Sequence, residues 1–98
     1  MARVKDITDK LSFDGNPCLV IKGNQIEVNG DAPTVLKIMG IMSGDGDDMD
    51  HLVNAYKLLF PEKSREEIDA LKLSVNDWVS VVEEAMNIVM EDDSQGEQ

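Results

Sequence analysis

Hydrophobic and polar residues alternate along CLVIKGNQIEV, residues 18–28, and this period of two predicts a β-hairpin. The pair Gly23-Asn24 suits a two-residue turn of type I′ or II′, which would place Ile21 opposite Ile26. The residues expected on the buried face are Leu19, Ile21, Ile26 and Val28. The residues expected on the exposed face are Val20, Lys22, Gln25 and Glu27. Since a lone hairpin is marginal in water, helices should cover its apolar face.

Two helices are predicted from the apolar positions that follow. Residues 32–42, APTVLKIMGIM, are apolar on nearly all sides, which predicts a central helix with Asp31 as its cap. Gly40 should let another element approach this helix closely. Residues 49–60 repeat apolar side chains at i, i+3, i+4 and i+7, and Pro61 should end this second helix.

Two further helices are predicted toward the end of the chain. SREEIDALKL predicts a short one, in which Ser64 and Glu67 have the spacing of a capping box. The last helix follows Ser74 as its N-cap, and its apolar face is wider than the roughly 100° that one core contact needs. We therefore expect this helix to serve two surfaces. The residues expected to pack on the core are Val75, Trp78, Val79, Val82, Met86 and Val89.

A partner-binding patch is predicted on the other side of this last helix. The residues expected to form it are Val81, Ala85, Ile88, Met86 and Met90. The first three should lie at the edge of the core contact or outside it, where exposed apolar side chains usually mark an interface. The two methionines would let the patch adapt to more than one partner.

These elements predict an α+β fold, mostly α, with an N-terminal β-hairpin packed on a small bundle of about four helices. The 98 residues suit one small domain, expected over residues 1–92. The residues before the hairpin predict a weak helix or an extended arm, and residues 93–98 a disordered acidic tail. The sequence has no run of eighteen apolar residues, so no membrane span is expected. Its single cysteine indicates a reducing, cytosolic compartment.

The net charge of −11 comes entirely from the second half of the chain. Residues 1–42 carry five basic and five acidic side chains, whereas residues 43–98 carry four basic and fifteen acidic ones. Such a field repels nucleic-acid phosphates and anionic membranes, so neither is an expected partner. It favours solubility and a basic or neutral protein partner.

The stretch SGDGDDMDH, residues 43–51, is the candidate for a metal site, because five of its nine residues are Asp or His. An EF-hand loop that starts at Asp45 has Met49 at its fifth position, where Asp or Asn is required. Asp50 then replaces the glycine of position six, and Tyr56 the glutamate of position twelve. We interpret the stretch as a connector whose aspartates begin the next helix, where negative charge suits the helix dipole. No specific metal site or cofactor is expected, and weak, incidental binding of a cation by the clustered carboxylates stays open.

No catalytic constellation is found in the sequence. His51 falls on the polar side of its helix without a second His or a Cys nearby, and Cys18 has no base as a partner. Glu83 and Glu84 are adjacent and point in different directions around their helix. Trp78 belongs to the apolar stripe, where it should pack in the core or an interface. The sequence therefore predicts that the protein is not an enzyme.

The order of elements resembles that of the tail assembly chaperones of long-tailed bacteriophages and prophages, of the Firmicutes type. The likeness runs from the hairpin CLVIKGNQIEV to the helical segment EEIDALKLSVNDWVSVVEEAMNIV and an acidic tail, over roughly residues 17–92. It implies a non-enzymatic chaperone in the host bacterial cytosol. Such a chaperone binds the tape-measure and tail-tube proteins during tail morphogenesis. Self-association would be a further use of its apolar surface.

Two other functions stay open. An acidic inhibitor that mimics nucleic acid and blocks a DNA-binding protein would explain the net charge, although the acids of the last helix do not form two regular rows. A small protein-interaction adaptor would explain the wide apolar face. Binding that survives high salt would favour the chaperone over the mimic, because salt screens exposed charges.

Overall fold

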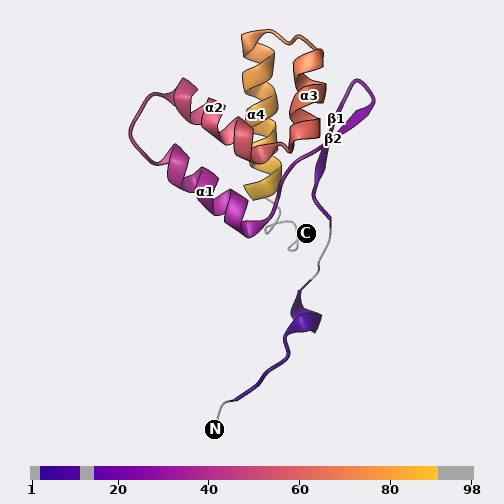
Figure 1. Ribbon diagram of the computed structural model, residues 1–98, viewed down its shortest axis with the longest axis vertical. Coiled ribbons are helices and arrows are strands. Elements are labelled where there is room, and N and C mark those ends of the chain that lie inside the picture. Colours follow the sequence, from indigo (N-terminus) through magenta and orange to yellow (C-terminus); the bar gives the residue numbers. More distant parts are fainter. Residues whose placement is uncertain (1–2, 12–14, 91–98) are drawn as a thin grey trace.

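A two-stranded antiparallel hairpin followed by four α-helices makes up the part of the chain that the computed structural model describes, residues 3–11 and 15–90 (Figure 1). The strands are β1 (Cys18–Ile21) and β2 (Asn24–Glu27). The helices are α1 (Ala32–Met42), α2 (Asp48–Leu59), α3 (Glu62–Ala70) and α4 (Val75–Met90), preceded by the 3-10 turn η1 (Thr8–Lys10). The predicted fold class is confirmed. The tail expected at residues 93–98 lies outside the described residues.

The hairpin pairs its strands in a register that differs from the predicted one. Leu19 lies opposite Ile26, and the turn consists of Lys22 and Gly23. Their φ angles of 52° and 81° are both positive, as a type I′ turn requires. The predicted turn at Gly23-Asn24 is therefore wrong by one residue. The pairing moves by two residues, which keeps every side chain on its predicted face because strand side chains alternate.

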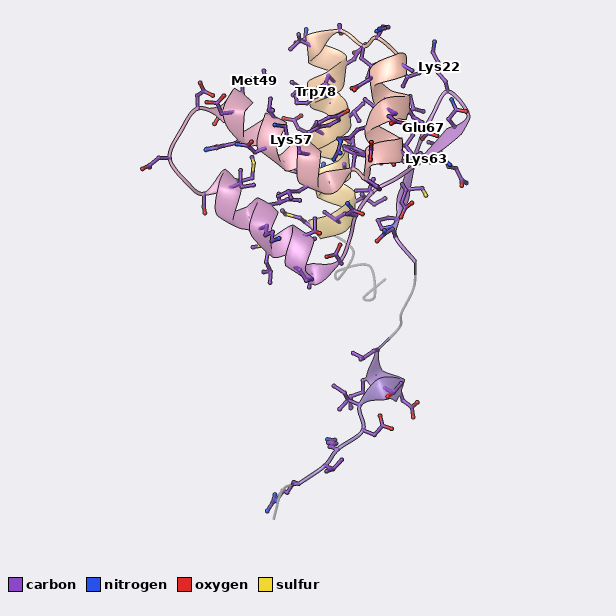
Figure 2. The ribbon with its side chains drawn as sticks, viewed as in Figure 1. Lys22, Met49, Lys57, Lys63, Glu67 and Trp78 are labelled. Carbon is purple, nitrogen blue, oxygen red and sulfur yellow. The ribbon has the colours of Figure 1, made fainter. Side chains whose placement is uncertain are left out.

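The burial of the hairpin follows these two faces. Ile26 and Val28 are buried, and Leu19 and Ile21 are half-buried against the core. The exposed side chains of the other face are those of Cys18, Val20, Lys22, Gln25 and Glu27. Lys22 lies at the tip of the hairpin (Figure 2).

Side-chain caps begin three of the helices, and two of these caps, Asp31 and Ser74, are the predicted residues. The side-chain oxygens of Asp31, Asp47 and Ser74 accept hydrogen bonds of 3.1, 2.9 and 3.2 Å from the backbone N–H three residues later. Each bond satisfies one of the N–H groups that the first turn of a helix leaves without a partner. The connector over residues 43–47 thus joins α1 to α2 as predicted.

α3 begins earlier than predicted. Pro61, with φ of −60°, is its N-cap, and Glu62 is its first residue, so Ser64 lies inside the helix. The predicted capping box is therefore wrong. Proline fixes φ at a value that suits the start of a helix, and this allows α3 to begin before the serine. Ser64 is buried, and its hydroxyl is used elsewhere: Oγ donates a 2.8 Å hydrogen bond to the carbonyl oxygen of Glu27.

The core lies between the hairpin and the helices. Its largest fully buried side chains are Phe60, Ile26, Ile38, Leu59, Ile68, Val28 and Val82. Beside them, Tyr56 packs against two other aromatic rings. Its ring centroid lies 5.4 Å from that of Phe60 and 5.2 Å from that of Trp78. Figure 2 shows Trp78 where α2 and α4 come together. Tyr56 and Trp78 thus join these two helices through an aromatic contact.

α1 lies at the periphery, although its apolar sequence predicted a central helix. Ile38 is its one buried side chain, whereas Leu36 is 64% exposed and Met39 50% exposed. α1 packs along α2 (Figure 1). A Cβ atom added at Gly40 would meet nothing within 4 Å, so the close approach expected there does not occur. Small domains bury a limited share of their surface, and the core of this one does not cover a helix that is apolar on all sides.

Residues 3–11 form an arm that runs away from the body along the longest axis of the molecule (Figure 1). The turn η1 interrupts the arm, which is otherwise extended, so both predicted forms are present in part. Val4 is 92% exposed, and Ile7 and Leu11 are about half exposed. The arm therefore presents three large apolar side chains to solvent.

Candidate protein-binding groove

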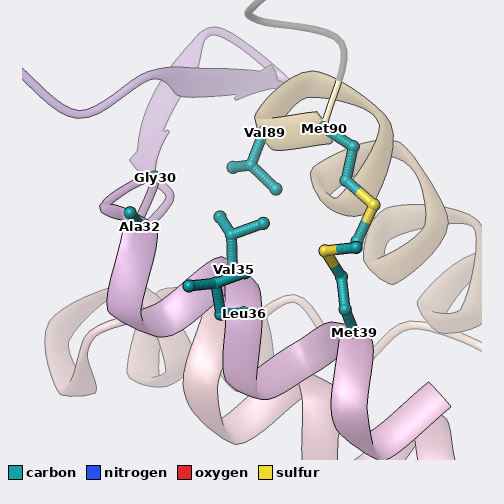
Figure 3. A pocket seen from close by; sticks show the side chains of 7 residues that line it. All are labelled: Gly30, Ala32, Val35, Leu36, Met39, Val89 and Met90. Carbon is teal, nitrogen blue, oxygen red and sulfur yellow. The ribbon is translucent and has the colours of Figure 1, made fainter. Parts of the chain in front are cut away.

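An apolar hollow of about 490 Å³ lies between α1 and the C-terminal end of α4 (Figure 3). We call it the α1–α4 groove. The residues that line it are Gly30, Ala32, Val35, Leu36, Met39, Val89 and Met90. None of them carries a charged or hydrogen-bonding side chain, so the side chains of the groove offer apolar contacts.

The α1–α4 groove exists because α1 packs mainly against α2, which leaves space between α1 and α4. α1 packs against α2, and α2 against α4, but α1 has no comparable packing against α4. Gly30 fixes the near end of the groove: its N–H donates a 3.2 Å hydrogen bond to Asn16 Oδ1, and an added Cβ would lie 3.0 Å from Pro17 Cδ. The segment before α1 is thus held against the start of the hairpin, and the space beyond it stays open.

Two methionines give the groove an adaptable wall. Met39 extends from α1 and Met90 from α4, and Figure 3 shows the two side chains reaching toward each other across the opening. Met39 and Met90 are 50% and 41% exposed. Methionine is unbranched and polarizable, so it can shape itself to different apolar surfaces.

Asp31 places a negative charge where α1 begins. The pKa of the Asp31 carboxyl lies below its usual value because the carboxylate accepts two hydrogen bonds from Thr34. The bond from the Thr34 hydroxyl is the larger cause, and the bond from the Thr34 backbone N–H is the second. The carboxylate is therefore ionised over the physiological range, at the same end of α1 as Gly30 and Ala32 of the groove. A basic side chain that flanks an apolar ligand would be favoured there.

A second hollow, of about 590 Å³, opens between α2 and the connection from α3 to α4. Its lining residues are Met49, Val53, Ile68, Asp69, Lys72, Leu73, Val75 and Trp78. Figure 2 places Met49 at the start of α2 and Trp78 on α4. Asp69 and Lys72 put charged side chains in the lining of this hollow, whereas the side chains that line the α1–α4 groove are all apolar.

The partner-binding residues predicted from the sequence differ in burial, and they do not form one exposed patch. Val81 and Ile88 are half-buried at the edge of the core contact, as expected, and Met86 is half-buried too. Ala85 has no exposed surface, so the prediction that it lies in a surface patch is wrong. It sits between Val82 and Val89 on the buried stripe, where a small side chain lets α4 approach the core. Of the five predicted residues, Met90 alone lines the α1–α4 groove.

The predicted core residues of α4 also divide. Val82 and Val89 are buried, and Trp78, Val79 and Met86 are half-buried against the core. Val75 is 66% exposed, so its prediction as a core residue is wrong. It stands at the first residue of α4, where the helix extends past the core.

Sequence reasoning missed the α1 side of the groove. Leu36 and Met39 were assigned to the interior because α1 is apolar on all sides. The signal that could have found them is the ratio of apolar helix surface to chain length, since a chain of 98 residues cannot enclose both α1 and α4.

The candidate chemical residues His51 and Cys18 lie in different surroundings. His51 is buried, contrary to the prediction that it lies on the polar side of α2, and its Nε2 is 3.0 Å from the carbonyl oxygen of Asp45. The ring packs beneath the connector, where it satisfies a loop carbonyl. Cys18 is exposed. Within residues 3–11 and 15–90, no three His, Cys, Asp or Glu side chains are grouped so as to hold a metal ion.

Comparisons with protein-family models, with curated proteins and with solved structures found no match to this chain. Among the helices that the structure describes, none has the length and apolar character to cross a membrane.

Proposed function

We propose that the protein is a tail assembly chaperone of a long-tailed phage or prophage, and that it holds an apolar helical segment of a tail protein in the α1–α4 groove. The observation that carries the proposal is the uncovered apolar lining of this groove, with Leu36, Met39 and Met90 exposed. Contiguous apolar surface is costly to leave in water and marks sites of protein interaction. The tape-measure and tail-tube proteins are the proposed partners.

The dimensions of the groove suit a helix. The α1 wall runs over the eight residues from Ala32 to Met39, and the seven helical rises between them span about 10 Å, or two turns. A partner helix of two turns would present apolar residues at i, i+3, i+4 and i+7, the usual pattern of helix-in-groove recognition. Met39 and Met90 would let one groove accept segments of different sequence, as a chaperone with two partners requires.

The charge of the chain supports the same role. A net charge of −11 keeps a protein with an exposed apolar groove soluble before it meets its partner. It also attracts segments in which basic residues flank the apolar ones. The charge therefore complements the groove and is not itself the binding site.

The test is a binding measurement with purified tape-measure and tail-tube proteins of the same phage. Leu36→Asp should weaken binding by at least tenfold, because it buries a charge in the apolar contact. Val20→Asp is the matched control: Val20 is 66% exposed against 64% for Leu36, and the added charge is the same, but Val20 lies on the outer face of the hairpin. Circular dichroism should show both variants folded.

Two outcomes would contradict the proposal. The first is failure of the wild-type chain to bind either tail protein. The second is binding to a DNA-binding protein that high salt abolishes and that Leu36→Asp leaves unchanged, because this is the behaviour of an acidic nucleic-acid mimic.

A further inference from the structure

The N-terminal arm carries an apolar stripe that its own body does not cover. Val4, Ile7 and Leu11 are exposed, and their spacing of i, i+3 and i+7 places them on one face of a helix. Residues 8–10 already form the 3-10 turn η1, and such turns are common where α-helices begin or end. The arm thus has the sequence pattern of a short helix that lacks a groove to lie in.

The α1–α4 groove matches this stripe in length and chemistry. Val4 to Leu11 is a stretch of eight residues, the same number as Ala32 to Met39 along α1. Both segments span about 10 Å in helical form. The side chains that line the groove are all apolar, and apolar contacts are those that the stripe can make. The residues after Met90, EDDSQGEQ, contain no large apolar side chain and are unsuited to the same space.

Charge also favours the arm as the occupant. The described arm carries three basic and two acidic side chains, whereas residues 43–90 carry four basic and eleven acidic ones. The ionised carboxylate of Asp31 lies beside the end of the groove. Arg3 and Lys10 flank the apolar stripe, so they can approach such carboxylates while the stripe is buried.

We infer that the arm of one copy docks in the α1–α4 groove of a second copy, whose own arm fills the groove of the first. The direction of the arm favours a second copy, because residues 3–11 run away from their own body (Figure 1). Reciprocal exchange closes a two-fold dimer and covers both grooves. The inference rests on the groove being a docking site, as in the proposed function, and adds that the arm occupies it until a partner displaces it.

Sedimentation of the full chain from low to high micromolar concentration tests the dimer. The wild-type protein should pass from monomer to dimer. A double variant, Ile7→Gln with Leu11→Gln, should raise the dissociation constant by about a hundredfold or more. The matched control, Lys5→Gln with Asp9→Gln, lies on the opposite face of the arm, leaves the net charge unchanged and should dimerise as the wild type does. A monomeric wild-type chain, or a dimer that the apolar double variant leaves unchanged, would overturn the inference.

A disulfide identifies which groove the arm enters. In a Cys18→Ser background, Ile7→Cys combined with Met39→Cys should give a dimer on a non-reducing gel. Peptide mapping should join position 7 of one chain to position 39 of the other. A bond between these positions within one chain would show that the arm folds back on its own body. That result, or the absence of any bond between the two positions, would overturn the inference.

Partner binding separates this inference from the proposed function. The Ile7→Gln, Leu11→Gln variant should bind tail protein about tenfold more tightly than the wild type, because its groove is free. If no dimer forms but Leu36→Asp still abolishes partner binding, the inference alone is wrong. If the dimer forms as described and Leu36→Asp leaves the affinity for tail protein unchanged, the proposed function alone is wrong.

Discussion

The hydroxyl of Ser64 donates a 2.8 Å hydrogen bond to the carbonyl oxygen of Glu27, a residue 37 positions earlier in the chain. This bond ties α3 to the end of β2. Ser64 is buried, and the Glu27 carbonyl accepts the bond at the point where the strand leaves its partner. A side chain inside a helix thus completes the hydrogen bonding of a strand.

Ser64→Ala should lower the free energy of unfolding by about 1–3 kcal/mol, because it leaves the Glu27 carbonyl without this donor. Ser80→Ala is the control, since Ser80 is exposed on α4 and alanine is the better helix former. Denaturant unfolding measures both. Equal stability of the two variants would show that the hydrogen bond contributes nothing.

Tyr56 should titrate above the ordinary pKa of a tyrosine. The pKa of Tyr56 is raised to about 12. Burial of the ring is the largest cause, and the 3.0 Å hydrogen bond from its hydroxyl to Asp69 Oδ1 is the next. The neutral phenol is therefore favoured by folding. Its contribution to stability is complete below pH 10, the ordinary pKa, and is lost as the pH rises through about 12.

The absorbance of tyrosinate reports this titration directly, because Tyr56 is the single tyrosine of the chain. Asp69→Asn should lower the midpoint by removing a negative charge beside the hydroxyl. The midpoint should stay above 10, because burial, the larger cause, remains. A wild-type midpoint at the ordinary value would contradict the buried position of the ring.

Gly40→Ala should stabilise the protein. An added Cβ at Gly40 meets nothing within 4 Å, so α1 gains helix propensity worth about 0.5–1 kcal/mol without a clash. Gly23→Ala should instead cost about 1–2 kcal/mol, because Gly23 has φ of +81° in the hairpin turn. Thermal unfolding of the two variants should therefore move the midpoint in opposite directions. Destabilisation by Gly40→Ala would mean that another element does approach α1.

Ile26→Ala should lower the free energy of unfolding by about 2–4 kcal/mol, as truncation of a buried aliphatic side chain does. Val20→Ala, on the exposed face of the same hairpin, should cost less than about 0.5 kcal/mol. Ile26 is 1% exposed and Val20 66% exposed. Urea denaturation of both variants checks the assignment of the two faces. A larger loss from Val20→Ala would reverse it.

Local patterns predicted most of the fold. The alternation through Leu19, Ile21 and Ile26 was sufficient to assign the faces of the hairpin, because a period of two survives a shift of two residues. The caps at Asp31 and Ser74 depend on side chains that act within one turn, and both were found. The turn was misplaced by one residue because Lys22 adopts a positive φ, which lysine does rarely.

What depends on long-range packing could not be predicted. The spacing of Ser64 and Glu67 is that of a capping box, but the hydroxyl of Ser64 bonds to the end of β2, which packs beside α3 only in the folded chain. His51 looks exposed until the connector folds over it. The α1–α4 groove forms between two helices whose sequences meet only in the tertiary structure, so its α1 wall was assigned to the core. The same lack of tertiary information placed Ala85 in a surface patch, although it is fully buried.

The single buried side chain of α1 has a consequence for motion. Ile38 anchors this helix, whereas α2 buries His51, Leu52, Ala55, Tyr56 and Leu59. Sub-global opening that releases α1 therefore gives up far less burial than opening of α2, and the amide hydrogens of α1 should exchange with solvent sooner. One wall of the groove thus belongs to a helix that buries fewer side chains than α2 does. The groove can widen by hinge motion of α1 while α2 and α4 stay folded, so partner segments of different girth can enter the same opening.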